Sequence, residues 1–400
     1  MKLPITGTAF GVMLGVLAAL PPLSIDMPLP ALVAVTQSLH TQSSLAGLTL
    51  SLFMAGFAVS PIVYGPLADR NGRRPLLMAG LLLFVAGGLG AAAAPSIGLL
   101  LVSRLVQGAG AGAGMTLAFA IVRDLFAGRQ AQARLAAIAV VANVAPIIAP
   151  TVGAVLLGLV GWRGIYGVTV LAGLLLLTTV GLGLAETLPP HKRASAVTLR
   201  GLMRDYGSVF SHRGAMANIL INGLGFGWMF AYVTGSPLVF LGEMHLPAGV
   251  YGGLFACTGA GIVAGALLNG RLAHRGASSV VLLGIAMIGA VTVTLLLLAL
   301  TATRHEVPLP VLMPLLVLAT FCFGLATPSA SHGALAPMPE FAGIAGGLLT
   351  SMQMLGGALA SLLVSLLFPR LGAAAMAGVM AACALTAFAI YQCSLRPRLA

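Results

Sequence analysis

Twelve apolar segments follow one another along this 400-residue chain, and almost all of its charged residues lie in the breaks between them. A helix needs about 20 apolar residues to cross the hydrocarbon core of a bilayer. Apolar residues make up 59% of the chain and charged residues 7%, whereas about 25% of a soluble domain is charged. A soluble core could not bury so much apolar surface, so the sequence predicts an all-α membrane protein with twelve transmembrane helices. The predicted spans are 5–30, 43–64, 76–94, 97–122, 135–157, 162–184, 214–238, 248–269, 279–301, 309–331, 344–367 and 372–393.

The basic residues are distributed unevenly between the two sides of this predicted arrangement. With the N-terminus inside, the inner segments hold sixteen Lys and Arg residues, the outer segments hold three, and one lies within a span. Cytoplasmic segments of membrane proteins carry such an excess. The formal charge of +12 therefore reports topology and not nucleic-acid binding, and both termini are predicted to be cytoplasmic. The inner residues are Lys2, Arg70, Arg73, Arg74, Arg123, Arg129, Arg134, Lys192, Arg193, Arg200, Arg204, Arg213, Arg271, Arg275, Arg396 and Arg398, and the outer ones are Arg163, Arg304 and Arg370.

The longest polar stretch, residues 185–213, divides the spans six and six. The predicted domains are an N-terminal six-helix bundle at 1–184, a cytoplasmic linker at 185–213 and a C-terminal six-helix bundle at 214–400. GPLADR at 65–70 and GRLAHR at 270–275 follow the second span of each half, 205 residues apart. So short a sequence similarity can arise by chance in a chain rich in Gly, Ala and Leu, but its matching position in each half favours an internal duplication. Two six-helix halves joined by a linker are typical of transporters, with the substrate cavity between the halves.

One carboxylate lies where water should be excluded. Asp26 follows an apolar helix that begins near Ile5, within the stretch ALPPLSIDMPLPALVAV at 19–35. Ionising a carboxylate inside a bilayer costs several kcal/mol, so such a group is protonated, paired or facing a wet cavity. Proton or cation coupling is the first hypothesis for Asp26, and the alternative is that it only caps the outer end of the first helix. The other acids lie in or beside the breaks, namely Asp69, Asp124, Glu186, Asp205, Glu243, Glu306 and Glu340.

Nothing in the sequence indicates an enzyme. It contains no HExxH or GxSxG motif and no cluster of His and Asp within a span. The four cysteines sit singly in apolar helices without metal-binding spacing, at Cys257, Cys322, Cys383 and Cys393. They are expected to be free thiols that act as small core residues. No metal and no cofactor is predicted.

The segment GPLADRNGRRPLL at 65–77 resembles the signature of the major facilitator superfamily, and it stands at the right place between spans 2 and 3. Gly65 and Gly72 permit tight turns, and Asp69 can pair with a helix N-terminus. Arg73 can reach a carboxylate at the end of span 4, which Asp124 supplies. In that family this cluster locks the outward-facing state, so the resemblance implies a gating role for Asp69, Arg73 and Asp124. The alternative is a topology anchor made of positive charges alone.

Span 4 carries RLVQGAGAGAG at 104–114, which resembles the second signature of the same superfamily, an arginine followed by Gln-Gly. An arginine in lipid is costly and should face the substrate cavity. Arg104 therefore needs an anionic or carbonyl partner, or water, and Asp26 is one candidate. The glycines at 108, 110, 112 and 114 also suggest a nucleotide-binding loop, but no strand precedes them. Close packing of helices through small residues explains them better.

Span 5 reads NVAPIIAPTVGA at 143–154 and resembles in part the antiporter signature of drug exporters. Pro146, Pro150 and Gly153 match it, whereas Ala145 and Ala154 stand where glycines are expected. The kinked helix with small residues is retained. This partial match does not by itself establish export.

Three further segments, PPLSIDMPLPAL at 21–32, VRDLF at 122–126 and SPLVF at 236–240, together resemble the bicyclomycin- and chloramphenicol-resistance branch of drug/proton antiporters. Asp26-Met27 and Leu29-Pro30 match that branch, but Pro28 stands where an aromatic residue is usual. The resemblance implies a proton-coupled multidrug efflux antiporter of the bacterial inner membrane. It would export small, mostly apolar antimicrobials by alternating access, act as a monomer, and use Asp26 for proton coupling.

Several residues within the spans are candidates for the wall of a substrate cavity. A cavity with few hydrogen-bonding groups suits the promiscuous binding of apolar drugs. Each polar candidate could instead bond a neighbouring helix. The alternative function on the same fold is a proton-coupled uptake symporter for a small metabolite, although sugar carriers would need more Asn, Gln and Glu in the spans. The candidates are Asp26, Arg104, Asn143, Asn218, Asn222, Tyr232, Met352 and Gln353.

Overall fold

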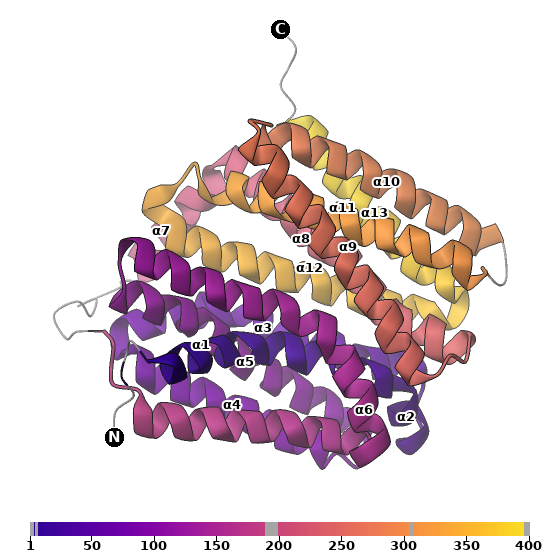
Figure 1. Cartoon of the computed structure of the whole chain (residues 1–400), viewed down its shortest axis with the longest axis horizontal. Helices are drawn as coiled ribbons and strands as arrows, with labels where there is room; N and C mark the ends of the chain where they lie inside the picture. The colour runs from indigo at the N-terminus through magenta and orange to yellow at the C-terminus, as the bar shows by residue number, and fades with distance from the viewer. Residues whose placement is uncertain (1–3, 5–6, 189–198, 304–306, 396–400) are drawn as a thin grey trace, which may run out of the picture. The chain divides into compact units, whose positions relative to one another are not determined.

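The computed structural model describes residues 4, 7–188, 199–303 and 307–395, and every element of regular structure in these ranges is a helix (Figure 1). The elements of the first half are α1 (Thr8–Asp26), the 3-10 turn η1 (Leu29–Ala31), α2 (Leu32–Ser38), α3 (Ser43–Asn71), α4 (Arg73–Ala92), α5 (Ile97–Leu125) and α6 (Gly128–Gly183). Those that follow are α7 (Leu199–Ser211), α8 (Arg213–Pro237), the π-helical turn η3 (Leu238–Glu243), α9 (Ala248–His274), α10 (Ser279–Thr303), α11 (Leu309–Leu335), η4 (Pro339–Phe341), α12 (Ala342–Leu371) and α13 (Ala373–Ser394).

The predicted all-α fold with twelve spans is confirmed. Within the described ranges, eleven helical segments are long and apolar enough to cross a membrane. One of them, α6, has 56 residues and is interrupted at Gly161, whose φ of 69° and ψ of 179° are not helical. Figure 1 shows the chain doubling back along α6. The predicted spans 135–157 and 162–184 are therefore the two parts of α6, and dividing α6 at Gly161 gives twelve spans.

The first compact unit comprises Met1–Thr41 and Leu52–Leu199. In this unit α1 and α4 each pack against both α5 and α6, and η1 packs against α6. Apolar side chains such as Leu17, Phe84 and Ile165 fill the interior and are fully buried. This packing places the end of α1, and with it Asp26, against α6.

The second compact unit comprises Gln42–Ser51 and Arg200–Ala400. Helix α8 packs against α11, α12 and α13, while α9 packs against α11. A hydrophobic cluster that includes Val209, Ile219 and Leu348 joins the amphipathic helix α7 to α8 and α12. The first residues of α3 belong to this unit, and there the Ser51 hydroxyl donates to the Ser361 hydroxyl over 2.8 Å. The unit boundary after Leu199 falls within the polar stretch 185–213.

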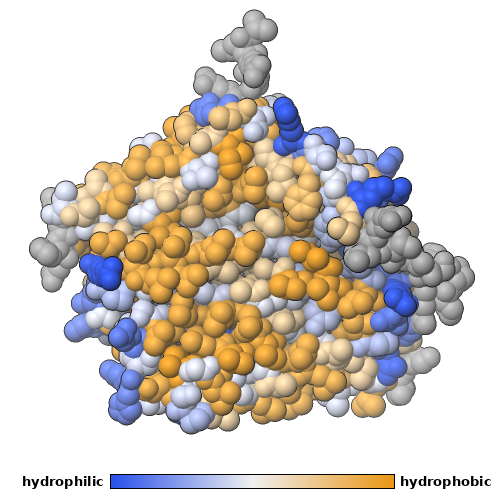
Figure 2. Space-filling model, turned by 180° about the vertical axis from the view of Figure 1, so that it is seen from behind, coloured by the Kyte–Doolittle hydropathy of each residue, from blue (hydrophilic) through white to orange (hydrophobic). Residues whose placement is uncertain are grey.

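Large apolar side chains remain exposed along the helices. On α6, Leu159, Leu171, Leu175 and Leu182 are between 67% and 76% exposed. Figure 2 shows apolar residues covering much of the face that it presents. Exposed apolar surface of this extent marks contact with a membrane or a partner, and its place on membrane-length helices indicates lipid.

The turn between spans 2 and 3 is shorter than the sequence predicted. Gly65 was expected in a turn, but α3 continues through it to Asn71, so that expectation is wrong. The chain changes direction at Gly72, whose φ of 99° favours glycine, and no second turn is needed. The charged residues that lie outside the described ranges are Lys2, Lys192, Arg193, Arg304, Glu306, Arg396 and Arg398.

Candidate functional site

Asp26 is the last residue of α1, at the point where the helix gives way to η1. Pro28 and Pro30 follow it, and since proline has no N–H the α-helical hydrogen bonds cannot continue. Asp26 is only 4% exposed. Across the described ranges no hydrogen bond or ion pair reaches its carboxylate. A capping role is disfavoured, because the groups left unpaired at a helix C-terminus are carbonyls, which a carboxylate cannot satisfy.

Helix α6 approaches the chain directly beside Asp26 through Gly153. A methyl group on Gly153 would overlap the backbone carbonyl oxygen of Met27. Residue 153 must therefore lack a side chain for α6 to lie so close to the end of α1. Pro146 and Pro150 lie inside the same helix. Of the partial antiporter signature, Gly153 thus has a direct packing contact next to the candidate proton site.

Arg104 lies on α5 and is 1% exposed. Its guanidinium donates to Gln107 Oε1 at 2.6 Å and to the Ser24 carbonyl at 2.9 Å. The guanidinium carbon also lies 4.3 Å from the centre of the Phe53 ring, a cation–π arrangement. The sequence predicted an anionic or carbonyl partner, and the bond to Ser24 is of the carbonyl type. Arg104 thereby ties α5 to α1 two residues before Asp26.

Gln107 extends the contacts of Arg104 to α6. Besides accepting from Arg104, its amide nitrogen donates to the Thr169 hydroxyl at 3.2 Å, and Gln107 is fully buried. A polar chain thus connects α1, α5 and α6 through Ser24, Arg104, Gln107 and Thr169. Gln107 was not among the predicted site residues. The signal was available in the sequence, because Gln107 stands one helical turn after Arg104, where side chains face each other.

The glycine ladder of α5 allows several helices to approach closely, as the sequence predicted. Side chains would overlap the Phe53 backbone of α3 at Gly108, and the backbone of α4 at Gly110. A side chain at Gly112 would overlap Ser60 of α3. The ladder therefore serves helix packing.

A second charged cluster joins the ends of α3, α4 and α5. Arg73 Nε donates to Asp124 Oδ2 at 2.8 Å, and Arg73 Nη1 lies 2.6 Å from Asp69 Oδ1. The predicted partnership of Arg73 and Asp124 is present. Asp69 was expected to pair with a helix N-terminus, and its described partner is Arg73, the first residue of α4. Asp69 is half-exposed, while the Arg73 and Asp124 side chains are largely buried.

Glu186 was not predicted as a site residue, yet it contacts this cluster. Its carboxylate accepts hydrogen bonds from the backbone N–H groups of Arg73 and Arg74. In the sequence it is one of seven acids beside a break between spans, and nothing local points to the start of α4.

In the second unit, Asn222 is the centre of a polar network. Its amide donates to the Ser331 hydroxyl at 2.9 Å and accepts from Gln353 Nε2 at 2.8 Å. These bonds join α8 to α11 and α12. Asn222 is therefore used in helix–helix bonding in this conformation, which is the alternative that the sequence left open for the polar cavity candidates.

The remaining cavity candidates make local contacts within their own units. Asn218 and Asn143 each donate to a carbonyl one turn earlier in their own helix, at 2.8 and 2.7 Å. The Tyr232 hydroxyl lies 2.8 Å from the Thr258 hydroxyl and is fully buried. Met352 packs at the edge of the cluster that contains Val209.

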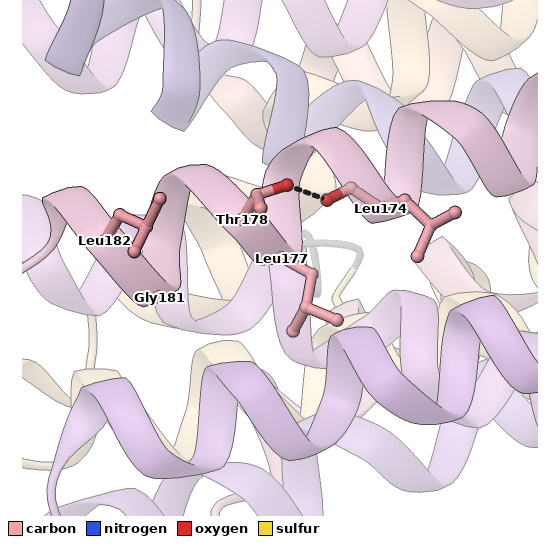
Figure 3. Close-up of a pocket in the computed structure, with 5 residues that line it drawn as sticks. All are labelled: Leu174, Leu177, Thr178, Gly181 and Leu182. Carbon is pink, nitrogen blue, oxygen red and sulfur yellow. Dashed lines mark hydrogen bonds between the residues drawn. The ribbon is translucent and has the colours of Figure 1, made fainter.

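Two hollows lie on the first unit, and neither contains the candidate site. The larger, about 500 Å³, lies along α6 and is lined by Leu174, Leu177, Thr178, Gly181 and Leu182 (Figure 3). Its one hydroxyl, of Thr178, donates to the Leu174 carbonyl within the helix. The smaller, about 130 Å³, lies between α1 and α6 beside Arg134. The larger hollow offers apolar surface and no free polar group, as expected of a lipid-facing helix. Among the described residues no group of His, Cys, Asp and Glu could hold a metal ion.

Comparison with known proteins identifies the family. The family model described as "Major Facilitator Superfamily" matches residues 14–361. An uncharacterized MFS-type transporter YdgK of Bacillus subtilis is 33% identical, over 90% of this chain and 89% of its own length. A bicyclomycin resistance protein homolog of Haemophilus influenzae is 27% identical, over 88% and 87%. Multidrug resistance protein MdtL of Shewanella oneidensis is 31% identical, over 59% and 58%.

The fold is also that of a solved transporter. A D-xylose–proton symporter aligns with a TM-score of 0.72 at 14% identity, covering 96% of this chain and 98% of its own. At this identity the likeness concerns the fold alone.

Proposed function

This chain belongs to the Major Facilitator Superfamily, and we propose that it is a proton-coupled antiporter that exports small, mostly apolar antimicrobials. Its relatives include a bicyclomycin resistance protein homolog and a multidrug resistance protein, which supports drug efflux on this multi-pass fold. The motifs at 21–32, 122–126 and 236–240 support the bicyclomycin- and chloramphenicol-resistance branch. The place of action would be the bacterial inner membrane, with both termini in the cytoplasm and the protein as a monomer.

The observation that carries proton coupling is the environment of Asp26. The residue is buried, and its carboxylate has no partner in the described ranges. An unpaired charge in such surroundings is strongly disfavoured, so Asp26 is most stable with a proton bound. Losing that proton requires water, a cation or a substrate group to reach the carboxylate. If drug binding releases the proton from Asp26, this single carboxylate couples drug export to proton import.

Two neighbours would keep Asp26 in place during this exchange. Arg104 holds the Ser24 carbonyl on one side, and Gly153 packs against the Met27 carbonyl on the other. Both contacts are made to backbone groups and not to the carboxylate. Asp26 can therefore gain or lose its proton while the end of α1 stays fixed to α5 and α6.

The cluster of Arg73, Asp124 and Asp69 would act as the gate. It ties the end of α5 to the start of α4 at 2.8 Å, so breaking the pair should favour the inward-facing state. Solvent screens the contact with Asp69, which is 49% exposed, more than the Arg73–Asp124 pair, whose side chains are 9% and 17% exposed. The polar residues Asn218, Asn222 and Gln353 would contribute to drug binding in a conformation that frees their amides.

Replacing Asp26 with asparagine tests the coupling. Asp26→Asn removes the titratable group at nearly constant shape, so drug-driven proton movement in proteoliposomes should be abolished while the protein stays folded. Asp205→Asn is the matched control, since Asp205 lies on α7 and its nearest cation, Arg204, is 3.6 Å away and exposed. Unchanged coupling in Asp26→Asn would exclude Asp26 as the proton site. In inverted vesicles with an acidic interior, an exporter accumulates drug, whereas an uptake symporter does not.

A further inference from the structure

Helix α4 begins without a capping residue of its own. Its N-cap is Gly72, which has a φ of 99° and no side chain that could accept a hydrogen bond. The first amides of a helix have no acceptor within the helix. In α4 these are the N–H groups of Arg73 and Arg74, because the next residue, Pro75, has none. The Gly72 N–H is already bonded to the Ala68 carbonyl at 3.0 Å.

Glu186, just beyond the end of α6, supplies both missing acceptors. Its Oε1 accepts from the Arg73 N–H at 2.9 Å, and its Oε2 accepts from the Arg74 N–H at 3.3 Å. Oε1 also accepts from the N–H groups of Thr187 and Leu188, each at 3.0 Å. One carboxylate therefore holds four amides from two segments that are 112 residues apart in sequence. Its negative charge is also favourable at a helix N-terminus.

The contact is reciprocal, because α4 in turn caps α6. Arg74 Nη2 donates to the Gly181 carbonyl at 2.5 Å, in the last turn of α6, where carbonyls lack helical partners. The φ of Gly72 favours glycine, and a methyl group there would also displace the Glu186 carboxylate from the start of α4. We call Gly72, Arg74 and Glu186 the α4–α6 clamp.

We infer that Glu186 is a positioning residue for the Arg73–Asp124 pair. The backbone of Arg73 is held by Glu186, and its side chain donates to Asp124 at 2.8 Å. The contacts of Glu186 are with backbone amides, so it acts through the position of α4 and not through the charge of Arg73. By binding Thr187 and Leu188 it also fixes the segment that leads out of the first unit. The consequence for transport rests on the proposed function.

The variant Glu186→Asp separates the contacts that Glu186 makes with α4 from those that it makes with Thr187 and Leu188. Aspartate keeps the charge and can still accept from the nearby Thr187 and Leu188 amides, but it is one methylene too short to reach α4. Hydrogen–deuterium exchange of the purified protein should show the Arg73 and Arg74 amides exchanging roughly tenfold faster or more. The amides of Thr187 and Leu188 should stay slow. Glu340→Asp, at an exposed carboxylate of η4, is the matched control and should change none of the four.

A double-mutant cycle tests whether the clamp positions Arg73. Asp124→Asn should lower the melting temperature of the otherwise unchanged protein. In the Glu186→Asp background the same substitution should lower it by roughly half as much or less, because the pair is already misplaced. Equal effects in both backgrounds would overturn the inference, as would unchanged exchange at Arg73 and Arg74. Neither measurement depends on the identity of the substrate.

Measurements of drug transport test whether the clamp affects function. Glu186→Asp should reduce the maximal rate roughly tenfold and leave KM within about twofold, since the clamp does not touch the drug. Wild-type rates in a variant whose α4 amides have been freed would refute the link to the gate. If the unmodified protein moved no drug, the proposed function would fail. Hydrogen–deuterium exchange and the double-mutant cycle of melting temperatures would still test the clamp.

Discussion

Replacing Gly153 with alanine is predicted to destabilise the first unit and to slow proton-coupled transport. The obstacle to the new methyl group is the backbone carbonyl oxygen of Met27. A backbone atom cannot rotate away as a flexible side chain can, so α6 or the end of α1 must move. Because Met27 adjoins Asp26, the movement would displace the carboxylate that we propose binds the proton.

The magnitude follows from two opposing effects. Alanine is favoured over glycine within a helix by about 1 kcal/mol, and overpacking costs about 1–3 kcal/mol. Gly158→Ala isolates the first effect, since Gly158 lies in the same helix and nothing is within 4 Å of a methyl group placed there. Gly153→Ala should therefore be less stable than Gly158→Ala by about 1–3 kcal/mol.

Unfolding by SDS in mixed micelles measures this difference, and drug-driven proton movement in proteoliposomes measures the functional effect. Gly158→Ala should be at least as stable as the unmodified protein and equally active. Equal stability and equal coupling in the two alanine variants would show that α6 does not need glycine beside Met27, and the reasoning from close approach would fail.

Two further substitutions test the buried arginines. Arg104→Lys should impair transport and cost about 1 kcal/mol of stability, because a lysine ammonium cannot hold both Gln107 and the Ser24 carbonyl as a planar guanidinium does. Normal transport in vesicles by both Arg104→Lys and Arg104→Ala would contradict this. Asp124→Asn should remove the charge that holds Arg73 and favour the inward-facing state, so spin labels on the α3–α4 and α11–α12 turns should lie further apart than in the unmodified protein at the same pH. An identical distance distribution would assign the cluster to topology and not to gating.

The helices were predictable from the sequence because their signal is local. Each span is a continuous apolar run of the required length, so even the two parts of α6, separated at Gly161, were placed correctly. The contact of Arg73 with Asp124 was also predictable, since the signature at 65–77 places Arg73 after span 2 and Asp124 is the carboxylate at the same end of span 4. The predicted turn at Gly65 failed because a glycine is tolerated inside a helix, and of these two glycines only Gly72 adopts a positive φ.

The contacts made by backbone groups could not be predicted. The partners of Glu186 are two amides of α4, and the partner of Arg104 on α1 is the Ser24 carbonyl. Every residue carries such groups, so the sequence contains no pattern that marks which one is used. The same holds for Asn222, where the sequence could not distinguish a bond to Ser331 and Gln353 from a bond to substrate.

The break at Gly161 leaves the two parts of α6 without a connecting loop. During synthesis, orientation in the membrane is set by basic residues in the segments that flank each span. The basic residue beside the break is Arg163, whereas Arg129 and Arg134 lie at the start of the first part. Lys192 and Arg193 follow the second part, so basic residues flank the pair of parts on both outer ends, and the positive-inside rule orients residues 128–183 as one helical hairpin.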